Sequence, residues 1–444
     1  MKYHRIKCNL YKAEGNSWEQ MAEELLSSAV REERVVRLVL FTHCTDNQEY
    51  KFQRSFLEQW VERHFVSPRP VVSLVAQKPL VANLVLEVHS LVEAADEALT
   101  IEEQFTSSSV RYLRIATSHY REIIAGGLCA DDLNLPVREQ SEQAFRKVEE
   151  ILKTEQMNFG DIVRQWNYLE RITDITHGNQ CYQDFNDVRT LFYASSAWES
   201  GYPAATGIGT QYGGILIDFN AVSGEVDIVP LDNDWQRAAH VYSDEVLISH
   251  RADTEKGTPK FERGKSLSDR QQEVIYISGT AAIRGEESVT TGDVLLQTEI
   301  TLENIQHLIG LEEGRENLPE HSGKLGLLRV YLKNEEDAPA VKADLDKLCP
   351  DLPIAYLYAD VCREELLIEI EGILICKSIV YYKRKTDETD STDSFTGIDV
   401  HLSGTLCLDI GSSHFCGKLL WPCHCPRVFL LCSLVYSVTV IAGS

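Results

Sequence analysis

Two glutamates in a short apolar segment are the residues best suited to acid–base chemistry. Glu369 and Glu371 stand in "ELLIEIEG", which alternates as a β-strand does. Because strand side chains point alternately to two faces, we expect both carboxyls on one face. An apolar setting raises the pKa of a carboxyl, and a second carboxyl nearby raises one of the two further. The pair could supply a proton donor at neutral pH; the alternative is a half-exposed sheet with both groups in solvent.

A glycine-dense segment, "WESGYPAATGIGTQYGGI" from Trp198 to Ile215, is a candidate anion site. Gly207 and Gly209 begin a dinucleotide-binding pattern, but Tyr212 holds its third glycine position, and the Gly-Lys-Ser/Thr of a phosphate loop is missing. Two interpretations remain: backbone amides that approach a carboxylate, or a tight turn between two strands. The strand-like "GGILIDFNAV" that follows favours the turn.

The overall charge narrows the class of partner. Lys and Arg number 43 against 68 Asp and Glu, so the formal net charge is -25. A surface of this sign argues against nucleic acid and against anionic membranes, since both attract basic faces. The N-terminal segment has no apolar signal-peptide core, so we expect a cytoplasmic protein whose 12 cysteines are reduced. The sequence shows no metal, nucleotide or redox motif, and we expect no cofactor.

The elements that would position these residues repeat along the chain. Segment 141–174 is typical of a helix followed by the strand "DIVRQWNYLERI", and segment 297–334 repeats this order with "LGLLRVYLKN". Each of the two strands contains an arginine, and further strands precede each unit. The second unit continues with a helix and two strands. We therefore predict an α+β fold of two similar domains, 1–175 and 176–374, each a mixed β-sheet backed by helices.

Residues 375–444 differ from the rest of the chain. "KRKTDETDSTDSF" is polar and linker-like. "RVFLLCSLVYSVTVIAG" is apolar, but it is shorter than the roughly 20 residues that a bilayer-spanning helix needs. We interpret this segment as an irregular, atypical C-terminal tail, a non-native extension rather than a membrane anchor.

The second half of the chain resembles the YjgF/RidA fold, because "ISGTAAI", "QTEITLENIQHLI", "LRVYLKNEEDAPAVKADL" and "IEIEGI" occur in that family's order and at about its spacing. The whole of residues 1–374 resembles the chorismatases, which carry two such domains in one chain. The supporting segments are "FNDVRTLFYASSAWESGYPAATGIGTQYGG", "TPKFERGK", "ISGTAAIRGEESV" and "ADVCREELLIEIEG". The expected fold is therefore a tandem of YjgF/RidA-like (chorismate mutase-like) domains.

The resemblance implies that the substrate is the small molecule chorismate and that pyruvate is released from it without a cofactor. Chorismate carries two carboxylates, and an enol ether joins its pyruvyl unit to the ring. Cleavage needs a proton on the terminal methylene carbon, cations for the carboxylates and a dry pocket. Glu369 matches the family's catalytic glutamate, so we assign it as the proton donor and expect Glu371 and Cys362 as the other catalytic residues.

The groups that would hold the substrate come from several segments. Arg pairs a carboxylate bidentately, so cationic side chains are the first candidates. The expected substrate-binding residues are Arg189, Tyr202, Thr206, Gly207, Lys260, Arg263, Ala281, Ala282 and Arg329. For Arg329, in an apolar strand, the alternative is an internal ion pair with an acid such as Glu369. For Lys260 and Arg263 the alternative is an ordinary loop charge, and the two alanines would shape the pocket around the ring.

Cys362, seven residues before Glu369, bears on the product. Hydroxybenzoate-forming members of the family carry a cysteine here, so the resemblance implies 3-hydroxybenzoate, or else 4-hydroxybenzoate; the alternative for Cys362 is a small buried hydrophobe. A hydrolase giving a dihydroxycyclohexadiene carboxylate, a RidA-like enamine/imine deaminase and a non-catalytic ligand-binding protein are the other functions considered. The deaminase is disfavoured because Ile354 and Ala355 stand about where those proteins place a carboxylate-binding arginine.

Overall fold

The structure, a computed structural model, describes residues 5–92, 99–176, 178–243, 257–268, 272–310, 323–377, 407–409 and 414–416. The chain divides into two compact units, Met1–Ile379 and Val380–Ser444. The described part of the second unit consists of two short antiparallel strands, β21 (Cys407–Asp409) and β22 (His414–Cys416). The polar and apolar segments of the predicted tail lie outside the described residues.

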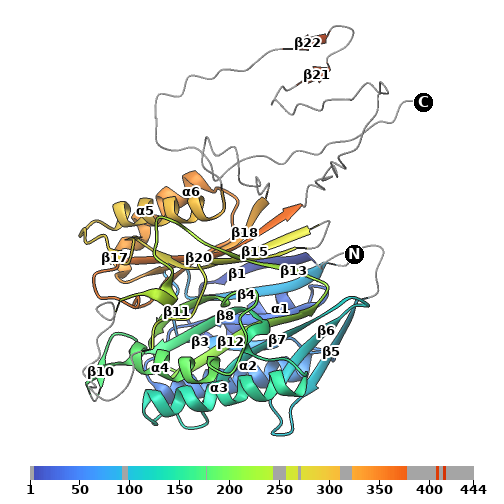
Figure 1. The fold of residues 1–444 in the computed structure, drawn as a ribbon. Coiled ribbons are helices and arrows are strands. Elements are labelled where there is room, and N and C mark those ends of the chain that lie inside the picture. Colours follow the sequence, from blue (N-terminus) through green and yellow to red (C-terminus); the bar gives the residue numbers. More distant parts are fainter. Residues whose placement is uncertain are drawn as a thin grey trace, which may run out of the picture. The chain divides into compact units, whose positions relative to one another are not determined.

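The described residues of the first unit form one four-stranded and two six-stranded sheets, which we number in chain order. The second and third sheets, both six-stranded, share one topology (Figure 1). In each, the chain runs strand–strand–strand–helix–strand–helix–strand–strand, and the strands lie in the spatial order 1-2-3-6-4-5. The second sheet consists of β5 (Thr100–Phe105), β6 (Arg111–Ala116), β7 (Tyr120–Cys129), α3 (Val137–Thr154), β8 (Ile162–Glu170), α4 (Cys181–Tyr193), β11 (Ala204–Thr210) and β12 (Ile215–Gly224). The third sheet consists of β13 (Asp227–Leu231), β14 (Gly264–Ser268), β15 (Gln272–Ala281), α5 (Val294–Leu308), β18 (Gly323–Leu332), α6 (Ala338–Leu348), β19 (Ile354–Tyr358) and β20 (Ile368–Lys377).

The first sheet repeats the last four strands of this topology. Its elements are β1 (Arg5–Ala13), α1 (Trp18–Ala29), β2 (Val35–Phe41), α2 (Asn47–His64), β3 (Val71–Val75) and β4 (Leu84–Val92). Their order, β1-β4-β2-β3, corresponds to positions 3-6-4-5 of the other two sheets. The described residues therefore form three sheets of related topology where the sequence predicted two domains. Strands β2 and β3 are buried along their whole length, so they lack the alternation that marks a half-buried strand.

Both predicted domain boundaries need correction. The boundary at 175/176 separates β8 from β11 and β12, although the three strands belong to one sheet. The sheets change instead between β4 and β5 and between β12 and β13. The boundary at 374/375 falls inside β20, because Ile375 still pairs with Val274 and Cys376 with Gly323. The compact unit ends at Ile379.

The predicted repeat of helix and arginine-bearing strand is confirmed. The helix expected after residue 141 is α3, and the helix expected after residue 297 is α5. The strands that follow them are β8 and β18. The remaining short elements are η1 (Phe159–Asp161), β9 (Ile175–Thr176), β10 (Asn179–Gln180), η2 (Ala239–Val241), β16 (Ile283–Arg284), β17 (Glu287–Ser288) and η3 (Glu335–Asp337).

Three buried arginines tie the sheets together. Each stands on the strand at position 4 of its sheet and forms an ion pair with an acid of another sheet. The pairs are Arg37 with Asp218, Arg164 with Glu371, and Arg329 with Glu87. All three guanidinium groups lie over the ring of Trp166, at 4.6 to 5.4 Å from its centroid. The arginine in the repeated strand therefore holds the sheets to one another.

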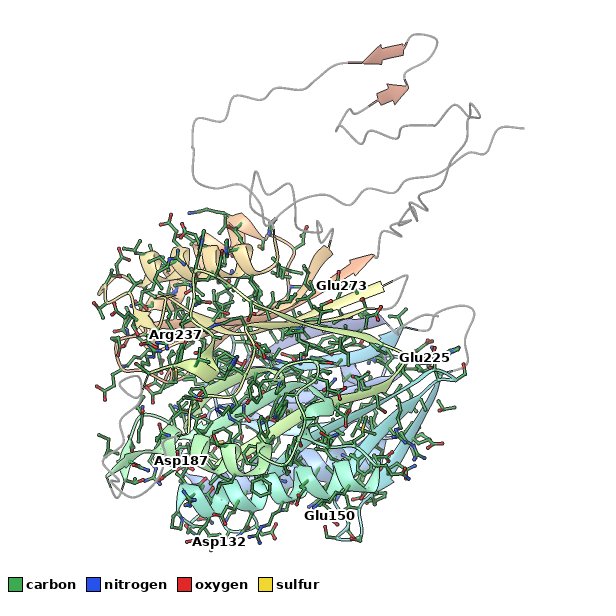
Figure 2. All side chains as sticks on the ribbon, in the orientation of Figure 1. Asp132, Glu150, Asp187, Glu225, Arg237 and Glu273 are labelled. Atoms are coloured by element: carbon green, nitrogen blue, oxygen red, sulfur yellow. The ribbon has the colours of Figure 1, made fainter. Side chains whose placement is uncertain are left out.

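The surface reflects the acidic composition. Asp132 and Glu225 are exposed, as Figure 2 shows. Among the helices of the described residues, none is both long enough and apolar enough to cross a membrane.

Candidate active site

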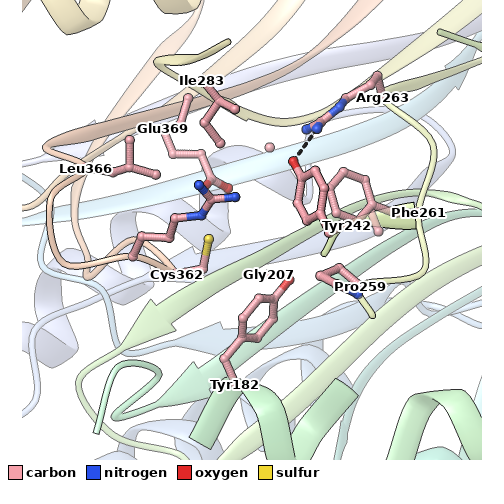
Figure 3. Close-up of a pocket in the computed structure, with 14 residues that line it drawn as sticks. Tyr182, Gly207, Tyr242, Pro259, Phe261, Arg263, Ile283, Cys362, Leu366 and Glu369 are labelled. Carbon is pink, nitrogen blue, oxygen red and sulfur yellow. Dashed lines mark hydrogen bonds between the residues drawn. The ribbon is translucent and has the colours of Figure 1, made fainter. Parts of the chain in front are cut away.

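A pocket lies where β11, the edge strand of the second sheet, meets β15 and β20 of the third sheet (Figure 3). The space between its lining side chains, including the open solvent at its mouth, has a volume of about 520 Å³. Five of the residues predicted for the site line this pocket: Gly207, Arg263, Ala281, Cys362 and Glu369. Both sheets contribute, so the site depends on their association.

Glu369 places a buried carboxyl on the wall of the pocket. It is 5% exposed and lies opposite Ala281 in the ladder between β20 and β15. Within the described part of the chain, the carboxyl forms neither an ion pair nor a side-chain hydrogen bond. Burial raises the pKa of Glu369 to about 8; the charge of Glu371 adds to this rise, and Arg164 and Arg263 oppose it. The group is therefore mostly protonated at neutral pH, as a general acid must be.

The backbone of β15 leaves room for this carboxyl. A register shift separates Ile277 from Thr280 in the ladder with β20, and Gly279 lies in this irregular stretch. A Cβ atom at Gly279 would collide with Oε1 of Glu369. Glycine at this position therefore lets the carboxyl lie directly against the strand.

Glu371 has a contrasting environment, although it shares a strand face with Glu369 as predicted. Its carboxylate accepts hydrogen bonds from five side chains: Trp166 (3.1 Å), Arg329 (3.0 Å), Tyr331 (2.9 Å), Arg164 and Thr206. It lies outside the pocket and lines a smaller cavity between the sheets. The predicted catalytic use of Glu371 is not supported, because these bonds engage both of its oxygens.

Two arginines of the pocket can receive carboxylates. Arg263 donates to the Arg237 carbonyl oxygen (2.8 Å) and to the Tyr242 hydroxyl, while its buried Nε has no partner among the described residues. Arg363 donates to the Glu286 carbonyl oxygen (2.7 Å), and its guanidinium lies 5.5 Å from the centroid of the Tyr242 ring. In the described residues, neither arginine pairs with an acid. Both therefore keep a positive charge at the pocket wall.

The prediction that Arg329 binds substrate is corrected by the structure. Its guanidinium forms a bidentate ion pair with Glu87, at 2.6 and 2.7 Å, and also donates to Tyr168 and Glu371. It does not line the pocket. The alternative, an internal ion pair, therefore holds, with Glu87 and Glu371 as the acids in place of the expected Glu369.

Arg189 and Lys260 also lie outside the lining of the pocket. Arg189 is buried on α4 and donates to the side chain of Asn186. Lys260 donates to Thr258 (2.8 Å), and its Nζ lies 6.0 Å from the centroid of the Tyr202 ring. The structure does not bring these two cations to Glu369.

The glycine-dense segment forms β11 and the turn before β12, so the predicted turn accounts for its second half. Its backbone amides donate to protein oxygens, with the pairs Tyr202 to Glu262, Ala205 to Ser278, Gly209 to Asp360, Gly213 to Asn47, and Gly214 to Glu170. The other interpretation, backbone amides that approach a carboxylate, is therefore wrong for these amides. Gly207 serves packing, since a Cβ atom there would lie 2.8 Å from the Tyr182 ring.

Tyr202 and Thr206 likewise take structural positions. The Tyr202 ring packs 4.5 Å from Trp198 and 6.2 Å from Tyr193, measured between ring centroids. Thr206 is buried, and its hydroxyl donates to Glu371. Neither residue lines the pocket, so their predicted contact with substrate is not supported.

Cys362 lies between Glu369 and Tyr182 in the view of Figure 3. Burial, with a contribution from the charge of Glu369, raises the pKa of the Cys362 thiol to about 12. The thiol is therefore neutral, and it can shape the pocket but cannot act as a thiolate. Ala281 lines the pocket as predicted, whereas Ala282 is fully buried outside its lining. The described residues contain no group of three or more His, Cys, Asp or Glu side chains that could hold a metal ion.

Sequence reasoning missed nine residues of the pocket wall: Tyr182, Ala205, Tyr242, Pro259, Phe261, Gly279, Ile283, Arg363 and Leu366. Arg363 directly follows Cys362 and could have been found from that position. Six of the others stand in segments that carry the family resemblance, but no charge or spacing marks them as site residues. Tyr182 and Tyr242 stand outside those segments and carry no local signal.

Comparison with known proteins gives three findings. Residues 98–221 match the family described as Chorismatase FkbO/Hyg5-like, N-terminal. A 3-hydroxybenzoate synthase of Streptomyces hygroscopicus is 33% identical over 233 residues, which are 50% of this chain and 65% of that protein. A chorismatase of Streptomyces rapamycinicus is 33% identical over 232 residues, 49% of this chain and 65% of that protein. The chain thus spans just under two thirds of the length of these curated relatives.

A solved structure extends the likeness of fold. The crystal structure of a chorismatase has a TM-score of 0.61 and 21% identity, and the match covers 84% of this chain and 99% of that one. At this identity the match establishes the fold. The protein is an α+β protein with the fold of that chorismatase, and its sequence is similar to chorismatases over about half of the chain; the resemblance seen in its sequence is thus confirmed.

Proposed function

We propose that this protein is an enzyme that cleaves chorismate to pyruvate and a hydroxybenzoate, with 3-hydroxybenzoate as the main product. The observation that carries the proposal is the buried carboxyl of Glu369, unpaired among the described residues, on the wall of a pocket that also holds Arg263 and Arg363; burial raises the pKa of this carboxyl to about 8. The names of the curated relatives, 3-hydroxybenzoate synthase and chorismatase, support it.

In this proposal Glu369 transfers its proton to the terminal methylene carbon of the enol ether. The neighbouring ring hydroxyl adds to the oxocarbenium carbon and releases its proton. The ring then loses a proton and its bond to this hydroxyl oxygen, which makes it aromatic. The hemiketal that is left on the ring separates into pyruvate and the phenol, which takes up the released proton. The proton lost from the ring restores Glu369. Chorismate equals pyruvate plus hydroxybenzoate in atoms, so the reaction consumes no water, whereas the diol-forming alternative consumes one water molecule.

The charges of the pocket suit a dianionic substrate. Arg263 and Arg363 would pair with its two carboxylates. A protonated Glu369 adds no negative charge beside them, so the substrate meets no repulsion from the group that must approach its enol ether. The two arginines also offset the negative field of a chain whose net charge is -25.

The test is incubation of the purified full chain with chorismate, without added metal or nucleotide. We expect pyruvate and 3-hydroxybenzoate in equal amounts by chromatography. Pyruvate with a dihydrodiol would instead indicate the hydrolase, and hydrolysis of a free imine without chorismate turnover would indicate the RidA-like deaminase. No turnover of either substrate by folded protein would overturn the proposed activity.

A further inference from the structure

The strand registers define equivalent positions in the three sheets. In each sheet the strand at position 4 carries the buried arginine. The residue two positions after that arginine lies opposite an acid on the neighbouring strand, the one at position 6. The facing pairs at this second position are Val39 with Glu87, Trp166 with Asp218, and Tyr331 with Glu369. The facing pairs at the arginine itself are Arg37 with His89, Arg164 with Asn220, and Arg329 with Glu371. Glu369 is thus the counterpart of Glu87 and Asp218.

In the first two sheets, this acid receives an arginine from another sheet. Arg329 of the third sheet binds Glu87 of the first, and Arg37 of the first binds Asp218 of the second at 3.1 Å. In both cases the arginine comes from the preceding sheet in the cycle first, second, third, first. By the same rule, Arg164 of the second sheet would bind Glu369 of the third. Arg164 instead pairs with Glu371.

A hydroxyl follows the same pattern. Ser73 of β3 faces Val39, and Thr206 of β11 faces Trp166, so the two hydroxyls are equivalent. Ser73 donates to Asp218 at 2.7 Å, whereas Thr206 donates to Glu371. The arginine that pairs with Asp218 and the hydroxyl that donates to it therefore have counterparts beside Glu369, and Glu371 binds both counterparts.

We propose that Glu371 is a positioning residue: by binding Arg164 and Thr206 it withholds them from Glu369, and thereby keeps the Glu369 carboxyl neutral and free to donate its proton into the pocket. The link to proton donation rests on the proposed function, whereas the effect of Glu371 on the ionisation of Glu369 does not. The other titratable groups that face the pocket beside Glu369 are Arg263, Cys362, Arg363, Tyr182 and Tyr242. None of them is altered in the variants below.

The variant Glu371→Asn tests the proposal, because Asn220 occupies the equivalent position in the second sheet. There Arg37 binds the Asn220 Oδ1 at 2.7 Å and still reaches Asp218. In Glu371→Asn, Arg164 is expected to reach Glu369 in the same way. The buried charges stay balanced, because Glu369 ionises in place of Glu371.

The readout is the protonated carboxyl of Glu369, measured without substrate by difference infrared spectroscopy. The infrared band of this protonated carboxyl is assigned to Glu369 by its loss in Glu369→Gln. In the unmodified protein we expect a titration midpoint near pH 8. In Glu371→Asn we expect a midpoint lower by about 1–3 pH units, the usual effect of an adjacent opposite charge. The pH above which chorismate turnover declines should fall by the same amount.

The double variant Arg164→Gln/Glu371→Asn separates positioning from a merely structural role. It removes the cation that would hold Glu369, so the midpoint should return to that of the unmodified protein. If Glu371→Asn does not fold, Glu371→Gln is expected to show the same lowering, because it also removes the charge that holds Arg164.

A midpoint that stays near pH 8 in the folded single variants would overturn the proposal, and so would a double variant that titrates like the single one. Failure of the proposed function alone would appear differently. The midpoints would then shift as expected while chorismate is not cleaved.

Discussion

Glu369 and Glu371 stand two residues apart on β20, yet the side chains around them differ: Glu369 lies on the wall of the pocket, and Glu371 lies in a hydrogen-bonded cluster. Glu371 accepts hydrogen bonds from five side chains of the second and third sheets. Glu369 receives none from the described side chains and faces a pocket. The two carboxyls share a strand, a face and nearly equal burial. The donors supplied by neighbouring strands therefore decide which acid is structural and which is available for chemistry.

The cations of the two regions differ in the same way. Near Glu371, Arg164 and Arg329 are neutralised by buried acids. In the pocket, Arg263 and Arg363 are bound to neutral oxygens. A balanced cluster holds the sheets together, whereas an uncompensated pair of cations leaves a place for an anionic ligand.

The largest expected effect is that of Glu369→Gln. Glutamine keeps the shape of the side chain but cannot donate a proton, so kcat for pyruvate release should fall by about 10²- to 10⁴-fold with little change in KM. Steady-state kinetics measure this, with Glu364→Gln in the exposed loop before β20 as the matched control. A nearly normal kcat in Glu369→Gln would remove the distinction between the two carboxyls.

Arg329→Met tests the structural side of the comparison. The substitution leaves Glu87 buried without its arginine and with His89 as its remaining partner, which costs about 3–5 kcal/mol of the free energy of unfolding. Urea denaturation measures this loss, and the protein that remains folded should keep its KM. A stable variant with a raised KM would instead restore the sequence-based prediction that Arg329 binds substrate.

Arg363→Gln tests the pocket cations. Loss of one charge-assisted hydrogen bond to a substrate carboxylate costs about 1.5–3 kcal/mol, so kcat/KM should fall by about 10- to 150-fold. Arg146→Gln, on the exposed side of α3, is the control and should leave kcat/KM unchanged. An equal effect of both substitutions would point to a nonspecific influence of charge.

The last prediction concerns how the stability of the protein depends on pH. The pKa of Glu369 rises from an ordinary 4.5 to about 8 on folding. A group raised in this way contributes stability that is fully present below pH 4.5 and is lost as pH rises through about 8. Glu369→Gln lacks this dependence, so the variant should gain stability relative to the unmodified protein between pH 5 and pH 9. Urea denaturation at both values measures the difference, and an unchanged difference would argue against the raised pKa.

The sequence predicted the elements on which the site stands, because their patterns are local. The alternation around Glu369 identifies β20, and the helical spacing after residues 141 and 297 identifies α3 and α5. The first sheet was not predicted, because β2 and β3 are buried throughout and their sequences do not alternate between apolar and polar residues. The resemblance to chorismatases supplied the choice of Glu369 over Glu371, which the local pattern leaves open.

The partners of the charged residues could not be predicted in this way. Arg329 binds Glu87, which lies 242 residues away in sequence and on another sheet. Tyr182 and Arg363 both line the pocket although they stand far apart in the sequence. Such contacts depend on how the sheets associate, and local patterns in a single sequence do not predict this association.

The pH dependence of chorismate cleavage tests the central claim most directly. If protonated Glu369 is the acid, kcat/KM for pyruvate release should be level at and below pH 7 and should fall about tenfold for each pH unit above the pKa of about 8. Glu369→Gln should show only residual turnover without this decline. A rate that stays level through pH 9, or a Glu369→Gln variant with the same decline and a similar rate, would contradict the assignment of Glu369 as the proton donor.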